Sequence, residues 1–194
     1  MIEFTWKGRK GSATATRLID MSEVDLAASY TAGKKVKATW IKMLHSGHSP
    51  IRVIQWRIEL KEIPSFVNGH LVRHKIGVEP FIKSLREDRC GNGDETRWSP
   101  QDGVFYMNPQ SLMTMATRRL CCQSSDATRM IALAVVDAVA ETDKELASQM
   151  VPMCIYRGGV CHEFQSCGLC PHWTKRNTDN SVWRVDQRKI KPIE

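Results

Sequence analysis

Two groups of side chains able to bind anions lie close together in the sequence. His70, Arg73 and His74 stand at positions i, i+3 and i+4, so a helix would place two imidazoles and a guanidinium on one face. Ser84 and Arg86 follow. In an extended run their side chains point the same way and present a hydroxyl beside a five-donor guanidinium fork. Both groups suit a phosphate-bearing ligand, although a solvated basic surface has the same pattern.

The flanking residues indicate the elements that position these groups. Pro64 suits the first turn of a helix, and Gly77 with Pro80 breaks it, so we expect a helix over 64–74 and an extended run over 81–86. Upstream, alternating apolar residues predict a central strand over 51–60, buried on one side, with the apolar face formed by Ile54, Trp56, Ile58 and Leu60.

The rest of the chain predicts further helices and strands around this segment. We expect a short first strand, a loop and a second strand within 1–17, and a mobile loop over 90–106 of a length that often covers an active site. Helices are predicted over 22–33, 34–44, 109–122 and 126–143, the last as the main core or subunit-packing helix.

Bulk properties narrow the class of protein. At 194 residues the chain is long enough for one domain with a proper core. The formal net charge of +7 and the pI near 9.1 predict phosphorylated or polyanionic partners. No apolar run approaches the roughly 20 residues that a membrane span needs. Because the N-terminus also has no signal-peptide pattern, we expect a cytoplasmic protein without membrane contact.

The anion-binding residues match a known signature. Arg73-His74-Lys75, followed after eight residues by Ser84 and then Arg86, resembles the signature of the flavin-dependent thymidylate synthases, in which Arg-His-Arg precedes Ser-x-Arg at nearly this spacing. The run His-Ser-Gly-His-Ser-Pro at 45–50 resembles the family's Gly-His-x-(Ser/Thr)-Pro segment. The similarity covers about 36–89, and a weaker one to short phage-type members extends to residue 159.

This resemblance implies a fold and an assembly. The fold would be α/β of the α+β type, with a central twisted, mostly antiparallel sheet flanked by helices and the first strand at an edge. A single catalytic domain would cover 1–172, followed by a basic extension over 173–194. The family's active sites are shared between the subunits of a homotetramer, so we expect the same here.

The resemblance also implies an activity. Members of the family convert dUMP to dTMP, taking carbon from methylenetetrahydrofolate and hydride from NADPH through FAD, so the protein supplies binding, orientation and electrostatics. The matching positions assign FAD contacts to His48, Arg73, His74 and Lys75, and substrate contacts to His70, Arg73, Ser84 and Arg86. Arg157 is the nearest candidate for the catalytic arginine that activates dUMP.

Two arginines near the end of the predicted helix over 109–122 have two interpretations. Arg118 and Arg119 could provide a second set of phosphate contacts for the substrate. Alternatively, they complement the helix dipole, since cations are favoured at a helix C-terminus.

Several positions depart from the family pattern, and most lie in the pyrimidine pocket. Lys75 replaces an arginine, His70 a glutamine that reads the uracil edge, and Ile82 a glutamate. The segment 147–152 lacks a nucleotide-binding arginine. An alternative is therefore an enzyme altered for another pyrimidine nucleotide, for example by hydroxymethyl transfer.

The C-terminal quarter is rich in cysteine and basic residues. Cys154, Cys161, Cys167 and Cys170 could close a tetrahedral zinc site, although only Cys167-x-x-Cys170 has a standard spacing. The alternative is reduced cysteines beside a tight Gly158-Gly159 turn. The remaining cysteines, Cys90, Cys121 and Cys122, are predicted as buried small apolar groups. Zinc together with basic and aromatic residues would also suit a protein that binds single-stranded nucleic acid.

Overall fold

The computed structural model describes residues 1–37 and 39–168, and the backbone of 173–175 and 183–185. Its centre is a five-stranded sheet of order β1-β2-β3-β5-β4, in which every neighbouring pair is antiparallel. The strands are β1 (Ile2–Trp6), β2 (Arg9–Arg17), β3 (Trp56–Pro64), β4 (Val78–Ile82) and β5 (Pro100–Met107). The predicted α+β fold, with the first strand at an edge, is confirmed.

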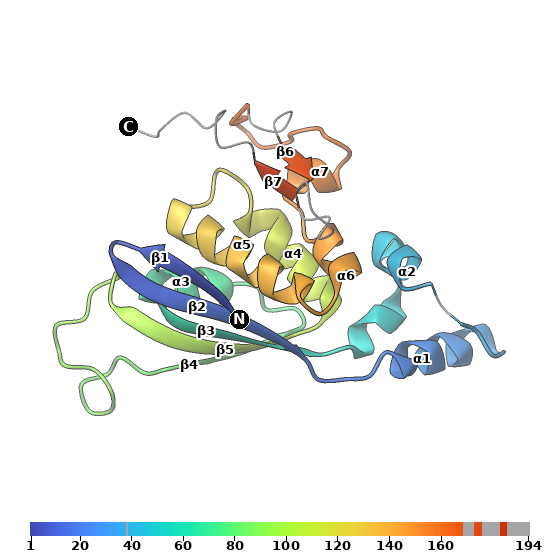
Figure 1. Cartoon of the computed structure of the whole chain (residues 1–194), viewed down its shortest axis with the longest axis horizontal. Coiled ribbons are helices and arrows are strands. Elements are labelled where there is room, and N and C mark those ends of the chain that lie inside the picture. Colours follow the sequence, from blue (N-terminus) through green and yellow to red (C-terminus); the bar gives the residue numbers. More distant parts are fainter. Residues whose placement is uncertain (38, 169–172, 176–182, 186–194) are drawn as a thin grey trace.

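Helices flank this sheet. They are α1 (Ser22–Ala32), α2 (Trp40–Ser46), the 3-10 helix η1 (Ser49–Val53), α3 (Ser65–Leu71), α4 (Pro109–Arg119), α5 (Asp126–Ala140), α6 (Lys144–Gln149) and α7 (Met153–Tyr156). The long helix α5 packs on β1, β2 and β3, while α1 and α2 project from one end of the molecule (Figure 1). The short strands β6 (Trp173–Lys175) and β7 (Trp183–Val185) pair with each other. Within the described residues, no helix is long and apolar enough to cross a bilayer.

The core lies between the sheet and helices α4 and α5. Strand β3 is central, and Trp56, Ile58 and Leu60 alternate on its buried face as predicted. The predicted start at residue 51 is wrong, because 51–53 belong to η1 and the strand begins at Trp56. Helix α5 contributes a continuous apolar face that includes Ile131 and Val135. Burying each such side chain stabilises the fold by roughly 1.5–3 kcal/mol relative to exposure. The core thus fixes α4 and α5 to the sheet.

A close approach at Gly103 seats α3 against the sheet. A Cβ atom added at Gly103 would lie 2.7 Å from Oδ1 of Asn68, a buried residue of α3, and 2.9 Å from Cδ1 of Ile82 in β4. The Asn68 amide also donates to Gln101 Oε1 at 3.0 Å. Because β5 carries no side chain at this point, α3 can lie close to β4 and β5.

Several predicted boundaries shift. The helix expected over 64–74 ends at Leu71, and the strand that follows covers 78–82 instead of 81–86. Pro80 lies inside this strand, which is tolerated because β4 is an edge strand that pairs only with β5. The predicted loop over 90–106 is also wrong in its second half, which forms β5. Ser84 and Arg86 therefore follow the strand and do not alternate within it.

Asn108 joins the start of α4 to the turn that precedes β4. Its Oδ1 accepts a hydrogen bond from Ser111 N at 2.9 Å, which caps α4, and its own N–H donates to the Gly77 carbonyl at 3.3 Å. Gly77 has a φ of 71°, and a Cβ atom there would meet the Asn108 side chain. The turn and the helix cap are therefore packed together.

Removing this cap is expected to have a modest effect. Asn108→Ala should lower the free energy of unfolding by about 1 kcal/mol, because Ser111 N loses its side-chain acceptor. Asn108→Ser keeps a capping oxygen and should lose only part of this. Urea unfolding monitored by circular dichroism measures both, and equal losses for the two variants would show that the cap is not the cause.

Candidate functional site

The first group of candidate residues lies where α3 ends. Arg73 and Lys75 are exposed, whereas His70 and His74 are half-buried. The backbone N–H of His74 donates to the Leu71 carbonyl at 3.0 Å, and this bond turns the chain out of the helix toward Gly77. The predicted shared helix face is thus divided, with the two long cations toward solvent and the two imidazoles toward the protein.

Each imidazole has a specific partner from another helix. His70 Nδ1 lies 2.8 Å from Oγ1 of Thr128, which is buried at the start of α5. The ring of His70 also packs edge-on against Phe66, with 5.5 Å between ring centroids. His74 Nε2 accepts from Nε of Arg119 at 2.9 Å. Because a guanidinium can only donate, His74 must carry its proton on Nδ1 when neutral.

Arg119 is the residue that connects these groups. Besides the hydrogen bond to the His74 ring, its Nη2 donates to the His70 carbonyl at 2.6 Å. One guanidinium at the end of α4 therefore holds both α3, through His70, and the turn after it, through His74. Its predicted role was a phosphate contact or a helix-dipole interaction. In the structure two of its nitrogens donate within the chain, and the phosphate contact stays a prediction.

The electrostatics of this region keep both histidines neutral. Burial and the neighbouring Arg119 and Arg118 lower the pKa of His74 to about 4. Burial, followed by the charges of Arg119 and Arg73, also lowers the pKa of His70. The cationic surroundings that disfavour imidazolium would favour a bound anion by the same Coulomb term.

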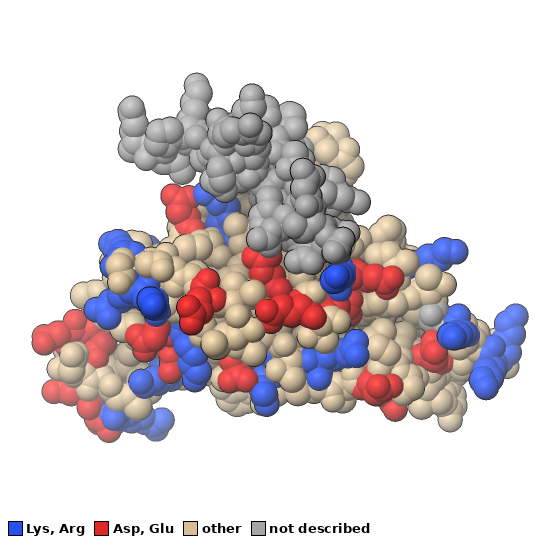
Figure 2. Space-filling view, in the orientation of Figure 1, with Lys and Arg blue, Asp and Glu red and all other residues tan. Residues whose placement is uncertain are grey.

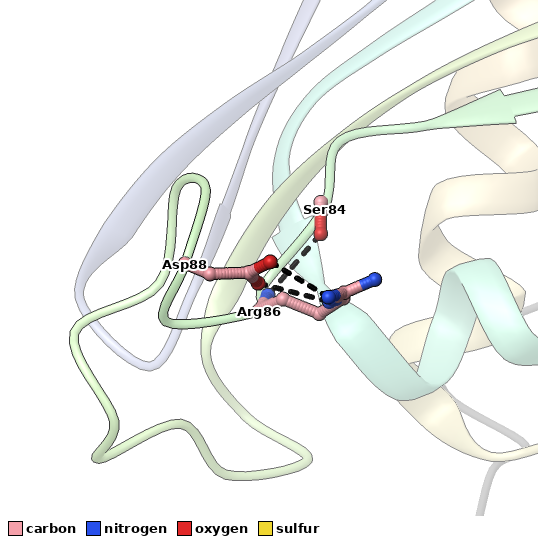
Figure 3. Close-up of polar contacts among 3 residues, drawn as sticks. All are labelled: Ser84, Arg86 and Asp88. Carbon is pink, nitrogen blue, oxygen red and sulfur yellow. Dashed lines mark hydrogen bonds and ion pairs between the residues drawn. The ribbon is translucent and has the colours of Figure 1, made fainter.

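The second group lies just beyond β4 (Figure 3). The backbone N–H of Arg86 donates to Ser84 Oγ at 3.2 Å, and its guanidinium forms a two-bond contact with Asp88 through Nε at 2.9 Å and Nη2 at 2.6 Å. Arg86 and Asp88 are both exposed. The fork that should hold a phosphate is therefore occupied by a carboxylate from its own loop, a partner that sequence reasoning missed.

The two groups lie on either side of β4 in the chain. The turn with Arg73 precedes β4 and the loop with Ser84 follows it, and five residues of strand span about 17 Å. His48 lies elsewhere again, exposed in a cavity of about 520 Å³ between α1 and α2. Figure 1 places α1 and α2 at the end of the molecule opposite the loop that follows β4.

The remaining candidates border a smaller cavity beside α4 and α7. This cavity, of about 220 Å³, is lined by Arg118, Arg157 and five cysteines, namely Cys121, Cys122, Cys154, Cys161 and Cys167. Arg118 pairs with Glu163 at 3.4 Å on the surface. We call this site the cysteine pocket.

The predicted zinc ligands are only partly described. Cys154, Cys161 and Cys167 share the cysteine pocket, while Cys170 lies outside the described residues. Between the residues that the structure describes, no three His, Cys, Asp or Glu side chains are already gathered into a metal site. The prediction that Cys90, Cys121 and Cys122 are buried is wrong, because Cys90 is exposed and the other two are half-buried.

Comparison with known proteins shows which solved structures share this fold. No family model and no curated protein sequence matches the chain. Two solved structures of thymidylate synthase X from Helicobacter pylori with FAD and dUMP superpose with TM-scores of 0.58 and 0.59 at 12% identity, covering 72% of this chain and 97% and 99% of theirs. A UMP/dUMP methylase, PolB from Streptomyces cacaoi with 5-Br dUMP, gives a TM-score of 0.55 at 14% identity over 71% of this chain and 94% of its own. The chain therefore has the fold of the flavin-dependent thymidylate synthases.

Proposed function

We propose that this protein is an FAD-dependent methyltransferase that converts dUMP to dTMP, with methylenetetrahydrofolate as carbon donor and NADPH as hydride donor. One observation carries the proposal: a chain with this fold places the matching signature residues on the turn after α3 and the loop after β4. Two of the structures that share the fold contain FAD and dUMP. Neither the fold nor the motif alone would support an activity.

The residues present fit an anionic cofactor. Arg73 and Lys75 are exposed, and among the residues described neither forms an ion pair with an acidic side chain. Arg73 also lies close enough to affect the pKa values of His70 and Arg119. FAD carries a pyrophosphate, which such a group of cations would bind, with His48 as a further contact from another part of the assembly.

The chain's own side chains would divide the work of binding and charge stabilisation. Bound FAD would supply the hydride transfer, which protein side chains cannot provide. Ser84 and Arg86 would hold the phosphate of dUMP, and Arg73 would contact both ligands. Arg157, exposed beside α7, is the candidate to stabilise negative charge that develops on the uracil ring.

The separation of these groups points to a shared site. The turn with Arg73 and the loop with Arg86 lie at opposite ends of β4, whose five residues span about 17 Å. We propose a homotetramer in which different subunits supply the two groups. Mixing inactive Arg73→Ala and Arg86→Ala proteins should then restore part of the activity, since some sites would receive both intact groups. Failure to complement, with a monomer mass by light scattering in the presence of FAD, would refute the shared site.

The direct test of function is reconstitution. Protein incubated with FAD should become yellow and change its flavin absorbance when dUMP is added. With methylenetetrahydrofolate and NADPH it should release dTMP, identified by mass spectrometry. Protein that stays colourless at high FAD concentration would overturn the proposal.

A second candidate keeps the fold but changes the pyrimidine reaction. PolB is named as a methylase of UMP as well as dUMP, so this fold accommodates more than one nucleotide. In this chain His70, which replaces a pocket glutamine, has its Nδ1 atom close to Thr128 and directed away from solvent. Parallel assays with dUMP, UMP and dCMP separate the candidates, because products other than dTMP would favour the altered enzyme.

Binding to single-stranded nucleic acid has less support. The face seen in Figure 2 shows Lys and Arg interspersed with Asp and Glu, not gathered into one basic surface. A strand-binding groove instead needs a continuous positive track.

The Asp88 carboxylate should compete with a phosphate for Arg86. Asp88→Asn is expected to strengthen dUMP binding about two- to fivefold, because an exposed ion pair is worth roughly 0.2–1 kcal/mol. Isothermal titration of dUMP into FAD-loaded protein measures this, and the gain should shrink at high salt. Asp94→Asn, in the same loop, is the matched control and should leave the affinity unchanged.

A further inference from the structure

The cysteine pocket gathers most of the chain's thiols, and Arg157, the residue proposed to act on the uracil ring, stands on its wall. Five cysteines line a cavity of about 220 Å³, although they come from three separate segments: the end of α4, helix α7 and the segment that follows it. Only Cys90, exposed on the loop after β4, lies elsewhere among the described cysteines. Thiols at such different positions in the sequence converge on one cavity.

Four of these thiols are also close enough to interact electrostatically. Cys122 and Cys167 are 45 residues apart, yet a hydrogen bond joins their side chains. Cys121 interacts with both Cys161 and Cys167. The four therefore line one cavity at the junction of α4 and the C-terminal segment.

Two polar contacts tie the segment that brings in Cys161 and Cys167 to α4 and the turn after it: the exposed Arg118–Glu163 pair at 3.4 Å and a hydrogen bond from Gln123 Nε2 to the Gln165 carbonyl at 2.9 Å. Residues 157–168 contain no helix or strand, and three of their glycines have positive φ. The large apolar side chains, Val160 at 54% and Phe164 at 112% exposure, face solvent and add no core. Ordering a residue costs roughly 1–2 kcal/mol of backbone entropy, so this segment needs another source of stability.

The charge around the pocket suits a thiolate centre. A divalent cation with four thiolates has a net charge of −2, and Arg118 and Arg157 stand on the wall of the same cavity. Arg157 would offset part of that charge, whereas Arg118 is already paired with Glu163, which lines the same cavity, at 3.4 Å.

We propose that the cysteine pocket is a structural site for a thiophilic divalent metal ion, Zn²⁺ by its ligand chemistry, held by Cys121, Cys122, Cys161 and Cys167. The thiols line a common cavity but do not yet meet at one point. The ion itself would draw them together and fix residues 157–168 against α4, because metal binding and local folding are coupled in small thiolate sites. This set replaces Cys154 and Cys170 of the spacing-based prediction with the adjacent pair at the end of α4.

The test uses the full chain and the metal alone. Protein purified under reducing conditions should contain about one zinc per chain by elemental analysis. Replacement with Co²⁺ should give the sulfur-to-cobalt charge-transfer and visible bands of a tetrahedral thiolate site. Cys122→Ser and Cys167→Ser should each weaken metal binding more than about 100-fold, whereas Cys90→Ser should not change it.

The outcomes distinguish the proposal from its alternatives. Reduced wild-type protein that binds neither zinc nor cobalt would overturn it, and so would unchanged affinity in Cys122→Ser. A Cys122–Cys167 disulfide in protein isolated without oxidant would also overturn it, in favour of a redox pair. If a serine variant fails to fold, the wild-type protein can be tested alone. Competition with a chromogenic chelator measures whether it binds the metal, and proton release on binding shows whether thiols are the ligands. None of these readouts depends on FAD or dUMP, so the metal site and the proposed activity stand or fall separately.

Discussion

Arg119→Met is expected to destabilise the protein by about 3 kcal/mol and to weaken FAD and dUMP binding at least tenfold. The half-buried guanidinium donates to the His70 carbonyl at 2.6 Å and to His74 Nε2 at 2.9 Å. Hydrogen bonds from a charged donor are worth roughly 1.5–3 kcal/mol each, and the variant leaves both acceptors without this donor. Relief of the repulsion between Arg119 and its neighbours Arg73 and Arg118 returns part of that loss.

Two further variants separate position from charge. Arg118→Met removes the adjacent cation, which is exposed and paired with Glu163 at 3.4 Å, and should change stability by less than about 0.5 kcal/mol. Arg119→Lys keeps the charge but cannot make both planar bonds, so it should lose most of what the methionine variant loses. Urea unfolding and FAD titration measure these effects. If Arg118→Met proved as damaging as Arg119→Met, net charge and not the two hydrogen bonds would be responsible.

Periodicity was sufficient to predict the framework of the fold. The apolar alternation from Ile54 to Leu60 predicted a central strand, since only a strand places every second residue on one face. The apolar stripe of α5 likewise predicted a core helix. The signature identified candidate anion-binding residues, whose role stays a prediction. These properties are local, so the sequence contains them directly.

Contacts between distant residues were not predictable in the same way. Arg119 reaches His74 across 45 residues, and nothing in the sequence distinguishes it from Arg118, which lies one position earlier and faces outward. The position of Pro80 suggested the end of an element, because its tolerance in β4 depends on that strand being an edge. The pairing of Cys122 with Cys167 also depends on how the segment after α7 packs against α4. Tertiary packing decides all three.

The neutral histidines make the protein sensitive to acid. The pKa of His74 is about 4 in the folded chain and 6.5 in the unfolded chain. Burial is the main cause of this decrease. Between pH 6.5 and 4 the unfolded chain therefore binds more protons, so stability falls as the pH falls through this window and is constant above it with respect to this group. His70 shifts in the same direction and adds to the slope.

Between pH 7 and pH 4, His74 should lower the free energy of unfolding by about 2 kcal/mol. This is less than the pKa shift alone would give, because solvent partly screens the half-exposed ring. His74→Gln offers Arg119 an acceptor that does not titrate, so its stability should fall less steeply over the same range. His45→Gln, at an exposed position of α2, is the matched control and should retain the wild-type slope. Chemical unfolding at several pH values measures all three proteins. Parallel curves for wild type and His74→Gln would mean that the pKa of His74 is the same in the folded and unfolded chains, and that burial and Arg119 do not lower it.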